Sequence, residues 1–208
     1  MQHRWLNRSR GAAQVIVVFG GWAIGPAVMS HLGGRADLLF VSDYRDLAAP
    51  LPDLSGYASR TLVAWSLGVA CYGHWQAAHP DPFDRRIAIN GSMTPVNRRT
   101  GIAPRLMRHT ARSLSEAGFQ QFLARCHGAS QPHQPIDVAA RRAELAAVMN
   151  RGDAPDRHWH RVWISRHDVI FTPDKLHRAW QGQAAVIRVI DAPHVPFALW
   201  SDWEQVLA

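Results

Sequence analysis

Residues 62 to 70 read Leu62-Val63-Ala64-Trp65-Ser66-Leu67-Gly68-Val69-Ala70. An apolar run typical of a buried strand meets a serine and continues directly into small residues that suit a helix. Such a turn holds its serine in a strained backbone conformation, so the residues two places before and two places after must be small. Gly68 fills the second position, and Ala64 stands where glycine is more usual. The segment predicts a nucleophilic serine, Ser66, at a strand-to-helix turn.

The pattern of a small residue two places before a serine and a glycine two places after it arises by chance in roughly one in ten chains of this size. Other segments of the chain must therefore support the prediction. Upstream, residues 14–19 read as a buried strand that runs into Gly20-Gly21-Trp22. Glycines let a backbone approach a substrate, so we expect the backbone amides of Trp22 and Leu67 to form an oxyanion hole. A nucleotide-binding loop is disfavoured because the G-x-G-x-x-G spacing and a following G-K-[ST] are both missing. A plain strand-ending turn remains the alternative.

Two further residues complete a possible catalytic set. Asp168 follows a short apolar run at 161–165, and His194 lies in the loop behind another run at 185–190. The order serine, acid, histidine is that of the α/β hydrolases. We expect His194 to accept and return the serine proton, and Asp168 to fix the imidazole tautomer. Asp191 is the alternative acid, although its place three residues before His194 favours a role in shaping the loop.

Composition and patterning predict one α/β domain. The chain has 208 residues with 47% hydrophobic content, enough for one good core. Apolar runs alternate with helical or loop segments, which indicates a mostly parallel sheet of the α/β-hydrolase type flanked by helices. The runs are 14–19, 37–42, 61–65, 86–90, 161–165 and 185–190.

The same patterns carry expectations about location and cofactors. No apolar run reaches the roughly 18 residues of a membrane span, and the basic N-terminus has no signal-peptide core. We therefore expect a cytoplasmic protein with no membrane partner. Cys71 and Cys126 lack disulfide or metal-ligand spacing, so we expect buried, reduced thiols and neither a metal nor a cofactor.

A helical insertion is predicted at residues 95–157. Helix-forming composition covers 102–114, 115–126 and 137–150, with Ser115 and Asp137 placed as N-caps. Above the active edge of the sheet, this insertion would form a lid. Its apolar side chains, with Trp22, are candidates to line an acyl channel; the candidates are Trp22, Phe119, Phe122 and Leu123, together with Leu106. The alternative that the lid residues only pack the lid is left open.

Charge is concentrated in the insertion. Residues 98–157 contain ten arginines against five acids, in a chain of formal net charge +7. Such an excess favours an acidic partner, although a solvated helix face explains many surface arginines. Nucleic acid is disfavoured, because neither zinc-finger spacing nor an RNA-recognition motif accompanies the arginines.

Several short segments carry a family resemblance in their order and spacing. They are Phe19-Gly20-Gly21-Trp22, Ser42-Asp43-Tyr44-Arg45-Asp46-Leu47, the stretch around Ser66, Ala88-Ile89-Asn90-Gly91-Ser92, Asp168-Val169-Ile170-Phe171 and Pro193-His194-Val195-Pro196-Phe197. In these segments the chain resembles the BioG-type pimeloyl-[acyl-carrier protein] methyl ester esterases of biotin biosynthesis. The resemblance implies a small α/β hydrolase that removes the methyl group from a pimeloyl chain attached to acyl carrier protein.

That resemblance also implies a role for the basic lid. Acyl carrier protein is acidic, and arginine pairs well with carboxylates and with the phosphopantetheine phosphate. The candidate carrier-binding residues are Arg105, Arg108, Arg112, Arg125, Arg141 and Arg142, although no family motif fixes which of them act. We expect a monomer. Alternatives remain open: a general small-acyl carboxylesterase or thioesterase, a noncatalytic hydrolase scaffold that binds an acidic partner, and a basic nucleic-acid-binding protein.

Overall fold

A seven-stranded sheet forms the centre of the structure, a computed structural model that describes residues 1–208. Its strands are β1 Gln2–Asn7, β2 Gln14–Phe19, β3 Asp37–Ser42, β4 Ser59–Trp65, β5 Arg85–Ile89, β6 Arg161–Ser165 and β7 Val186–Ile190. They lie in the order β1-β3-β2-β4-β5-β6-β7, and β1 alone runs antiparallel. The chain steps from β2 to β3 on one side and then crosses to β4 on the other. Ligands of open parallel sheets bind at such a switch point, outside the carboxyl ends of the strands.

The six predicted strands are confirmed, and the central ones are buried as parallel strands should be. Strand β1 was not anticipated. It reads Gln-His-Arg-Trp-Leu-Asn and is mostly exposed, because it pairs only at the edge of the sheet. A polar edge strand lacks the apolar run by which the other six were recognised.

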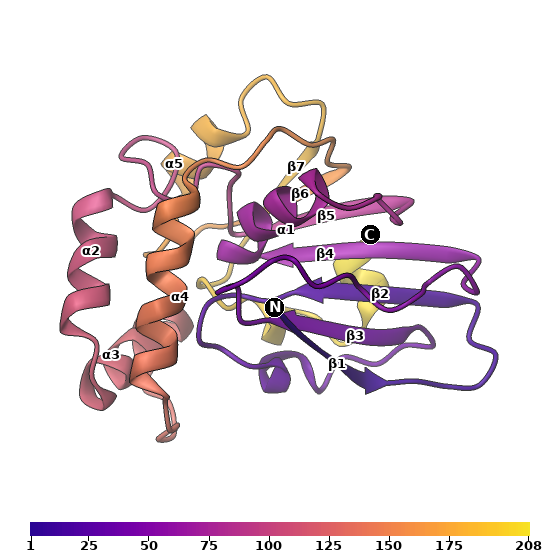
Figure 1. Cartoon of the computed structure of the whole chain (residues 1–208), viewed down its shortest axis with the longest axis horizontal. Helices are drawn as coiled ribbons and strands as arrows, with labels where there is room; N and C mark the ends of the chain where they lie inside the picture. Colours follow the sequence, from indigo (N-terminus) through magenta and orange to yellow (C-terminus); the bar gives the residue numbers. More distant parts are fainter.

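Six helices and two 3₁₀ turns complete the fold. They are α1 Leu67–Ala77, α2 Pro104–Ser113, α3 Glu116–His127, α4 Val138–Arg151, α5 Pro173–Ala179 and α6 Trp203–Leu207, with turns at Pro26–Met29 and Phe197–Leu199. Figure 1 shows α2, α3 and α4 gathered beyond the end of the sheet at which β2 and β4 finish. The insertion therefore covers the edge where a ligand is expected.

The predicted N-caps of the insertion are confirmed. The side chain of Ser115 accepts a hydrogen bond from the backbone N–H of Gly118, and that of Asp137 accepts one from Ala140. Each cap satisfies an amide that the first turn of its helix leaves unpaired. Local sequence thus set where α3 and α4 begin.

Both cysteines are free and buried, as expected. Burial in an apolar environment raises the pKa of both thiols, because it disfavours the thiolate. No helix combines the length and the hydropathy that crossing a bilayer would require.

The turn from β4 into α1 depends on Gly68. A Cβ atom at this position would lie 2.2 Å from the carbonyl oxygen of Phe19 and 2.6 Å from that of Gly20. Both contacts are with backbone, so no side-chain rotation relieves them. Ala64, on the other side of the turn, is completely buried in β4 and is accommodated. Glycine is therefore required at only one of the two small positions.

We expect Gly68→Ala to lower the free energy of unfolding by about 1–3 kcal/mol, because the added methyl group forces α1 away from the end of β2. Urea unfolding monitored by circular dichroism measures the change. Gly56→Ala is the matched control, since a Cβ there meets nothing within 4 Å. A Gly68→Ala protein as stable as the control would contradict this account of the turn.

Candidate active site

Ser66 lies in a backbone conformation that residues other than glycine rarely adopt. Its φ and ψ angles are 59° and −127°. Neighbouring strands hold it there: its N–H donates to the carbonyl oxygen of Ile89 at 2.9 Å, and Gly91 passes so close that a Cβ would lie 2.2 Å from the Ser66 carbonyl oxygen. Such strain persists only where the surroundings enforce it. The predicted strained serine turn is present.

The three predicted polar residues form one line of hydrogen bonds. Ser66 Oγ donates to His194 Nε2 at 2.9 Å, and His194 Nδ1 donates to Asp168 Oδ2 at 2.7 Å. The other carboxylate oxygen of Asp168 accepts the backbone N–H groups of Ile170 and Phe171, at 2.7 and 2.9 Å. An acceptor at Nδ1 keeps the proton on that nitrogen and leaves Nε2 free to accept from the serine. The arrangement can deprotonate Ser66 and stabilise the imidazolium that results.

Asn90 holds the histidine loop, a role that the sequence analysis missed. Its side-chain amide donates to the His194 carbonyl at 2.9 Å and to Ser165 Oγ at 2.7 Å, and its Oδ1 accepts the Ser165 N–H at 2.8 Å. Trp65 Nε1 donates to the same His194 carbonyl at 3.1 Å. Asn90 directly follows β5, where a buried polar residue at a strand end was the available signal.

The two backbone amides predicted to form an oxyanion hole are available for a ligand. Neither the N–H of Trp22 nor that of Leu67 has an acceptor within the protein. The loop that carries Trp22 lies against the serine, because a Cβ on Gly21 would be 3.3 Å from the Ser66 Cβ. Leu67 is the first residue of α1, whose N-terminal end favours negative charge. The site can therefore donate two hydrogen bonds to an oxygen that becomes negative beside Ser66.

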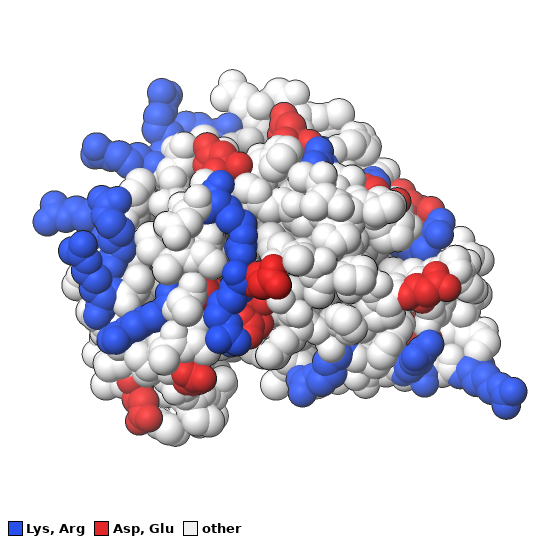
Figure 2. Space-filling model, in the orientation of Figure 1, with Lys and Arg blue, Asp and Glu red and all other residues white.

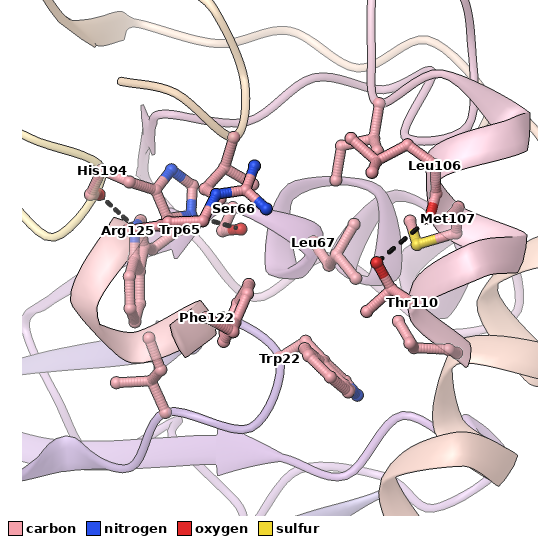
Figure 3. A pocket seen from close by; sticks show the side chains of 15 residues that line it. Trp22, Trp65, Ser66, Leu67, Leu106, Met107, Thr110, Phe122, Arg125 and His194 are labelled. Carbon is pink, nitrogen blue, oxygen red and sulfur yellow. Dashed lines mark hydrogen bonds between the residues drawn. The ribbon is translucent and has the colours of Figure 1, made fainter. Parts of the chain in front are cut away.

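A small, mostly apolar cavity of about 50 Å³ opens onto these groups. Figure 3 shows Leu106, Met107 and Thr110 entering from α2, and Phe122 and Arg125 from α3. The lining residues are Gly21, Trp22, Ile24, Trp65, Ser66, Leu67, Ile102, Leu106, Met107, Thr110, Phe122, Arg125, Leu145, Ile170 and His194. No group of three or more His, Cys, Asp or Glu side chains is arranged to hold a metal ion.

Of the four residues predicted to line an acyl channel, two line the cavity and two do not. Trp22 and Phe122 line the cavity, and their rings meet edge to face with centroids 5.1 Å apart. Phe119 and Leu123 do not line it and are buried in the core, at 1% and 0% exposure. Within one turn of α3, Phe122 therefore faces the cavity, whereas Phe119 and Leu123 pack into the core. The spacing of apolar residues in the sequence does not show which of them faces the cavity.

The six candidate carrier-binding arginines fall into three groups. Three are exposed on α2: Arg105, Arg108 and Arg112. Arg125 lines the cavity. Arg141 and Arg142 are engaged within the protein, because Arg141 pairs with Glu144 and Arg142 donates to the Leu114 carbonyl at 2.6 Å. Figure 2 shows basic side chains gathered over the end of the molecule formed by the insertion.

Sequence comparisons find one matching family and two relatives. The family model, described as pimeloyl-ACP methyl esterase BioG, matches residues 1–206. A Bacteroides fragilis protein named malonyl-[acyl-carrier protein] O-methyltransferase is 31% identical over 197 residues, which are 87% of this chain and only 39% of that protein. An uncharacterised Haemophilus influenzae protein is 31% identical over 204 residues, 91% of this chain and 92% of that protein.

Solved structures agree in fold. The crystal structure of BioG from Haemophilus influenzae matches with a TM-score of 0.88 and 26% identity, covering 100% of both chains. An enol-lactonase from Burkholderia xenovorans matches at 0.59 with 16% identity, covering 93% of this chain and 89% of its own. The type II thioesterase BorB matches at 0.60 with 16% identity, covering 99% and 95%. The predicted α/β-hydrolase fold is confirmed.

We expect Asn90→Ala to lower the free energy of unfolding by at least about 2 kcal/mol, because it leaves buried partners unpaired and removes a residue type that tolerates its left-handed backbone, φ 46°. Chemical denaturation measures the loss. Asn150→Ala is the control, since Asn150 is exposed on α4. Equal stability of the two variants would show that the Asn90 hydrogen bonds contribute little.

Proposed function

Because this chain belongs to the BioG family of pimeloyl-ACP methyl esterases, we propose that it hydrolyses the methyl ester of a pimeloyl chain carried by acyl carrier protein, releasing methanol, in biotin biosynthesis. The observation that carries the proposal is the hydrogen-bonded line from Ser66 through His194 to Asp168, beside two unpaired backbone amides. Serine esterases require these components. The family match and the BioG crystal structure support a hydrolase at the coarser level.

The first half of the proposed reaction forms an acyl-enzyme. Ser66 Oγ attacks the ester carbonyl carbon while its proton passes to His194 Nε2, and Asp168 stabilises the imidazolium. The amides of Trp22 and Leu67 donate to the tetrahedral oxyanion. When the intermediate collapses, the bond to the methoxy oxygen breaks, and His194 protonates that oxygen so that methanol leaves.

The second half releases the product. A water molecule gives a proton to His194 Nε2 and attacks the acyl carbon, and the same two amides stabilise the second oxyanion. The bond to Ser66 Oγ then breaks, and His194 returns the proton to the serine. The product is the free carboxyl end of the pimeloyl chain, still attached to its carrier.

The cavity supports an alkyl chain, provided that the lid opens. Its lining is largely aliphatic and aromatic, but about 50 Å³ is far below the roughly 300–1,000 Å³ of typical ligand pockets. Helix α2 is the part best suited to move, because Met107 is its only buried residue and Leu106 is 40% exposed. An outward shift of α2 would open a channel from Ser66 to the surface.

Helix α2 is also the proposed docking surface for the carrier. Arg105, Arg108 and Arg112 are spaced by three and four residues, so they share one face of the helix, and all three are exposed. Leu106, Met107 and Thr110 on the same helix line the cavity. An acidic carrier bound to the arginines would stand next to the entrance through which its acyl arm must pass.

The name of the Bacteroides fragilis relative is consistent with a carrier-bound ester. That protein is named as a methyltransferase for malonyl-acyl carrier protein, a reaction that places a methyl ester on a carrier-bound acid. Hydrolysis removes such a methyl group, again from an acid attached to a carrier protein. The relative is longer than this chain, which spans 39% of its length.

We expect Ser66→Ala to abolish hydrolysis of pimeloyl-carrier-protein methyl ester, and Asp168→Asn to lower kcat by about 10⁴-fold, because the asparagine disturbs the histidine tautomer. Methanol release measured with carrier-bound ester and with free dimethyl pimelate gives the rates. Asp191→Asn is the matched control: Asp191 is the alternative acid, but in the structure it pairs with exposed His167.

Four outcomes would count against parts of this proposal. Activity retained by Ser66→Ala would refute the mechanism, and a loss in Asp191→Asn equal to that in Asp168→Asn would refute the assignment of the acid. Equal rates with carrier-bound and free esters would favour a general carboxylesterase, and the absence of turnover by the wild type would favour a scaffold.

Charge reversal on α2 tests the docking surface. We expect the triple variant Arg105→Glu, Arg108→Glu, Arg112→Glu to raise KM for the carrier-bound ester by about tenfold or more and to leave dimethyl pimelate hydrolysis unchanged. The reason is that each arginine paired with an acidic group of the carrier contributes electrostatic attraction to binding, whereas dimethyl pimelate has no carrier. The control triple variant reverses exposed arginines outside the insertion, at Arg10, Arg35 and Arg188. If both triple variants raise KM equally, net charge rather than α2 is responsible.

A further inference from the structure

The segment Asp43-Tyr44-Arg45 follows β3 and takes no part in the proposed chemistry, yet it is built with strain and buried charge. Asp43 has a φ angle of 60°, in the left-handed region, and is only 4% exposed. Its carboxylate accepts two hydrogen bonds from the Arg45 guanidinium, at 2.7 and 2.6 Å. Arg141 of α4 lies 3.7 Å from the same carboxylate. A short loop with this much internal pairing is held in one conformation.

Glu144 joins this segment to the lid. It projects from α4 and is 1% exposed. Its Oε1 accepts the backbone N–H of Tyr44 at 2.8 Å, and its Oε2 pairs with Arg141 Nη1 at 2.5 Å. Burial raises the pKa of Glu144, whereas the Tyr44 N–H and the Arg141 charge lower it. Two carboxylates and two guanidinium groups thus balance one another, as buried charges must.

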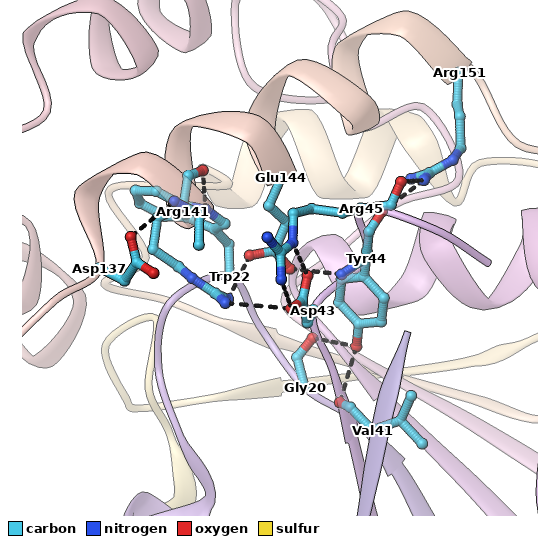
Figure 4. Close-up of polar contacts among 11 residues, drawn as sticks. Gly20, Trp22, Val41, Asp43, Tyr44, Arg45, Asp137, Arg141, Glu144 and Arg151 are labelled. Carbon is cyan, nitrogen blue, oxygen red and sulfur yellow. Dashed lines mark hydrogen bonds and ion pairs between the residues drawn. The ribbon is translucent and has the colours of Figure 1, made fainter. Parts of the chain in front are cut away.

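The same network holds the loop of residues 20–22, here called the oxyanion loop, at two points (Figure 4). Tyr44 Oη lies 2.8 Å from the carbonyl oxygen of Gly20, where the loop begins, and its ring is completely buried. Trp22 Nε1, at the other end of the loop, donates to the backbone carbonyl of Arg141 at 3.0 Å. Between these two points Gly21 lies against Ser66.

We propose that Glu144, together with Tyr44, is a positioning residue for the oxyanion hole, which fixes the Trp22 amide relative to Ser66 by locking the loop to α4. This inference rests on the proposed esterase function. The donors of an oxyanion hole must lie about 2.7–3.1 Å from the oxygen that develops charge. A displacement of roughly 1 Å can lower a rate by about 10²-fold. A lid helix that sets the loop therefore sets the rate of the chemical step.

Attachment of the lid alone does not account for this arrangement. Arg151, at the other end of α4, already ties the helix to the segment by donating to the carbonyl oxygens of Tyr44 and Arg45, at 2.6 and 2.9 Å. The contacts at Gly20 and Trp22 go further, to the two residues on either side of Gly21. Both hydrogen bonds therefore hold the loop that lies beside Ser66.

The test compares Glu144→Gln and Tyr44→Phe with wild type. Glutamine keeps the size of Glu144 and an acceptor for the Tyr44 N–H but removes the charge opposite Arg141. Phenylalanine removes only the Tyr44 hydroxyl, which lies 2.8 Å from the Gly20 carbonyl oxygen and 3.2 Å from that of Val41. Glu116→Gln is the matched control, because it makes the same chemical change at an exposed position on lid helix α3. Thermal unfolding identifies which variants are folded.

Two readouts are taken on the folded proteins. Hydrogen–deuterium exchange of the peptide covering residues 20–25 reports loop order without any substrate. Hydrolysis of p-nitrophenyl butyrate reports kcat and KM. We expect faster exchange in this loop in both variants, and kcat lower by about 10- to 100-fold with KM changed by less than about threefold, because the transition state rather than substrate binding depends on the donor. Glu116→Gln should match wild type in both readouts.

Unchanged exchange in the loop overturns the inference, and so does unchanged kcat in an active enzyme. A fall in kcat accompanied by faster exchange throughout the chain also overturns it, since that result describes a structural role. If wild type hydrolyses no ester, the proposed function fails separately. The exchange measurement then still decides whether Glu144 and Tyr44 order the loop.

Discussion

The strained turn at Ser66 requires strand β4 and helix α1 to pack closely against β2. A serine at φ 59° and ψ −127° can point its hydroxyl off the end of β4 only if strand and helix pass within contact of β2. Gly68 permits that approach, and the hydrogen bond from the Ser66 amide to Ile89 holds the turn from the β5 side. The strain is stable because the parts of β2, β4 and β5 next to the turn are buried and closely packed, so they cannot relax around it.

Sheet topology then determines which groups meet the serine. The oxyanion loop follows β2, and Asp168 and His194 follow β6 and β7, so all of them arrive at the carboxyl edge with β4. Ser66 and His194 are 128 residues apart in sequence, yet their side chains are 2.9 Å apart. Asn90, at the end of β5, lies between them in the strand order and holds the histidine loop by its main chain. Five of the six parallel strands, all but β3, therefore contribute one component each at their ends.

The insertion combines a loosely packed helix and a firmly held one. Helix α2 buries only Met107 and exposes three arginines on one face, and these two features underlie the proposal that it moves and binds an acidic carrier. Helix α4 is tied by Glu144 and Arg151 to the segment after β3, and through Trp22 to the oxyanion loop. The two proposals, opening for substrate and support of the loop beside Ser66, therefore concern different helices. This division allows access without loss of the geometry that chemistry requires.

Features that depend on neighbouring residues could be predicted from the sequence: six strands from their apolar runs, the caps at Ser115 and Asp137, and the order of Ser66, Asp168 and His194. The folded structure established which side chains pack together. It added the polar edge strand β1, turned Phe119 and Leu123 into the core, engaged Arg141 and Arg142 internally, and brought Glu144 within hydrogen-bond distance of the Tyr44 N–H. Caps and turns are satisfied within a few residues, whereas burial and contacts such as that between Tyr44 and Glu144, 100 residues apart, form only when distant segments pack together.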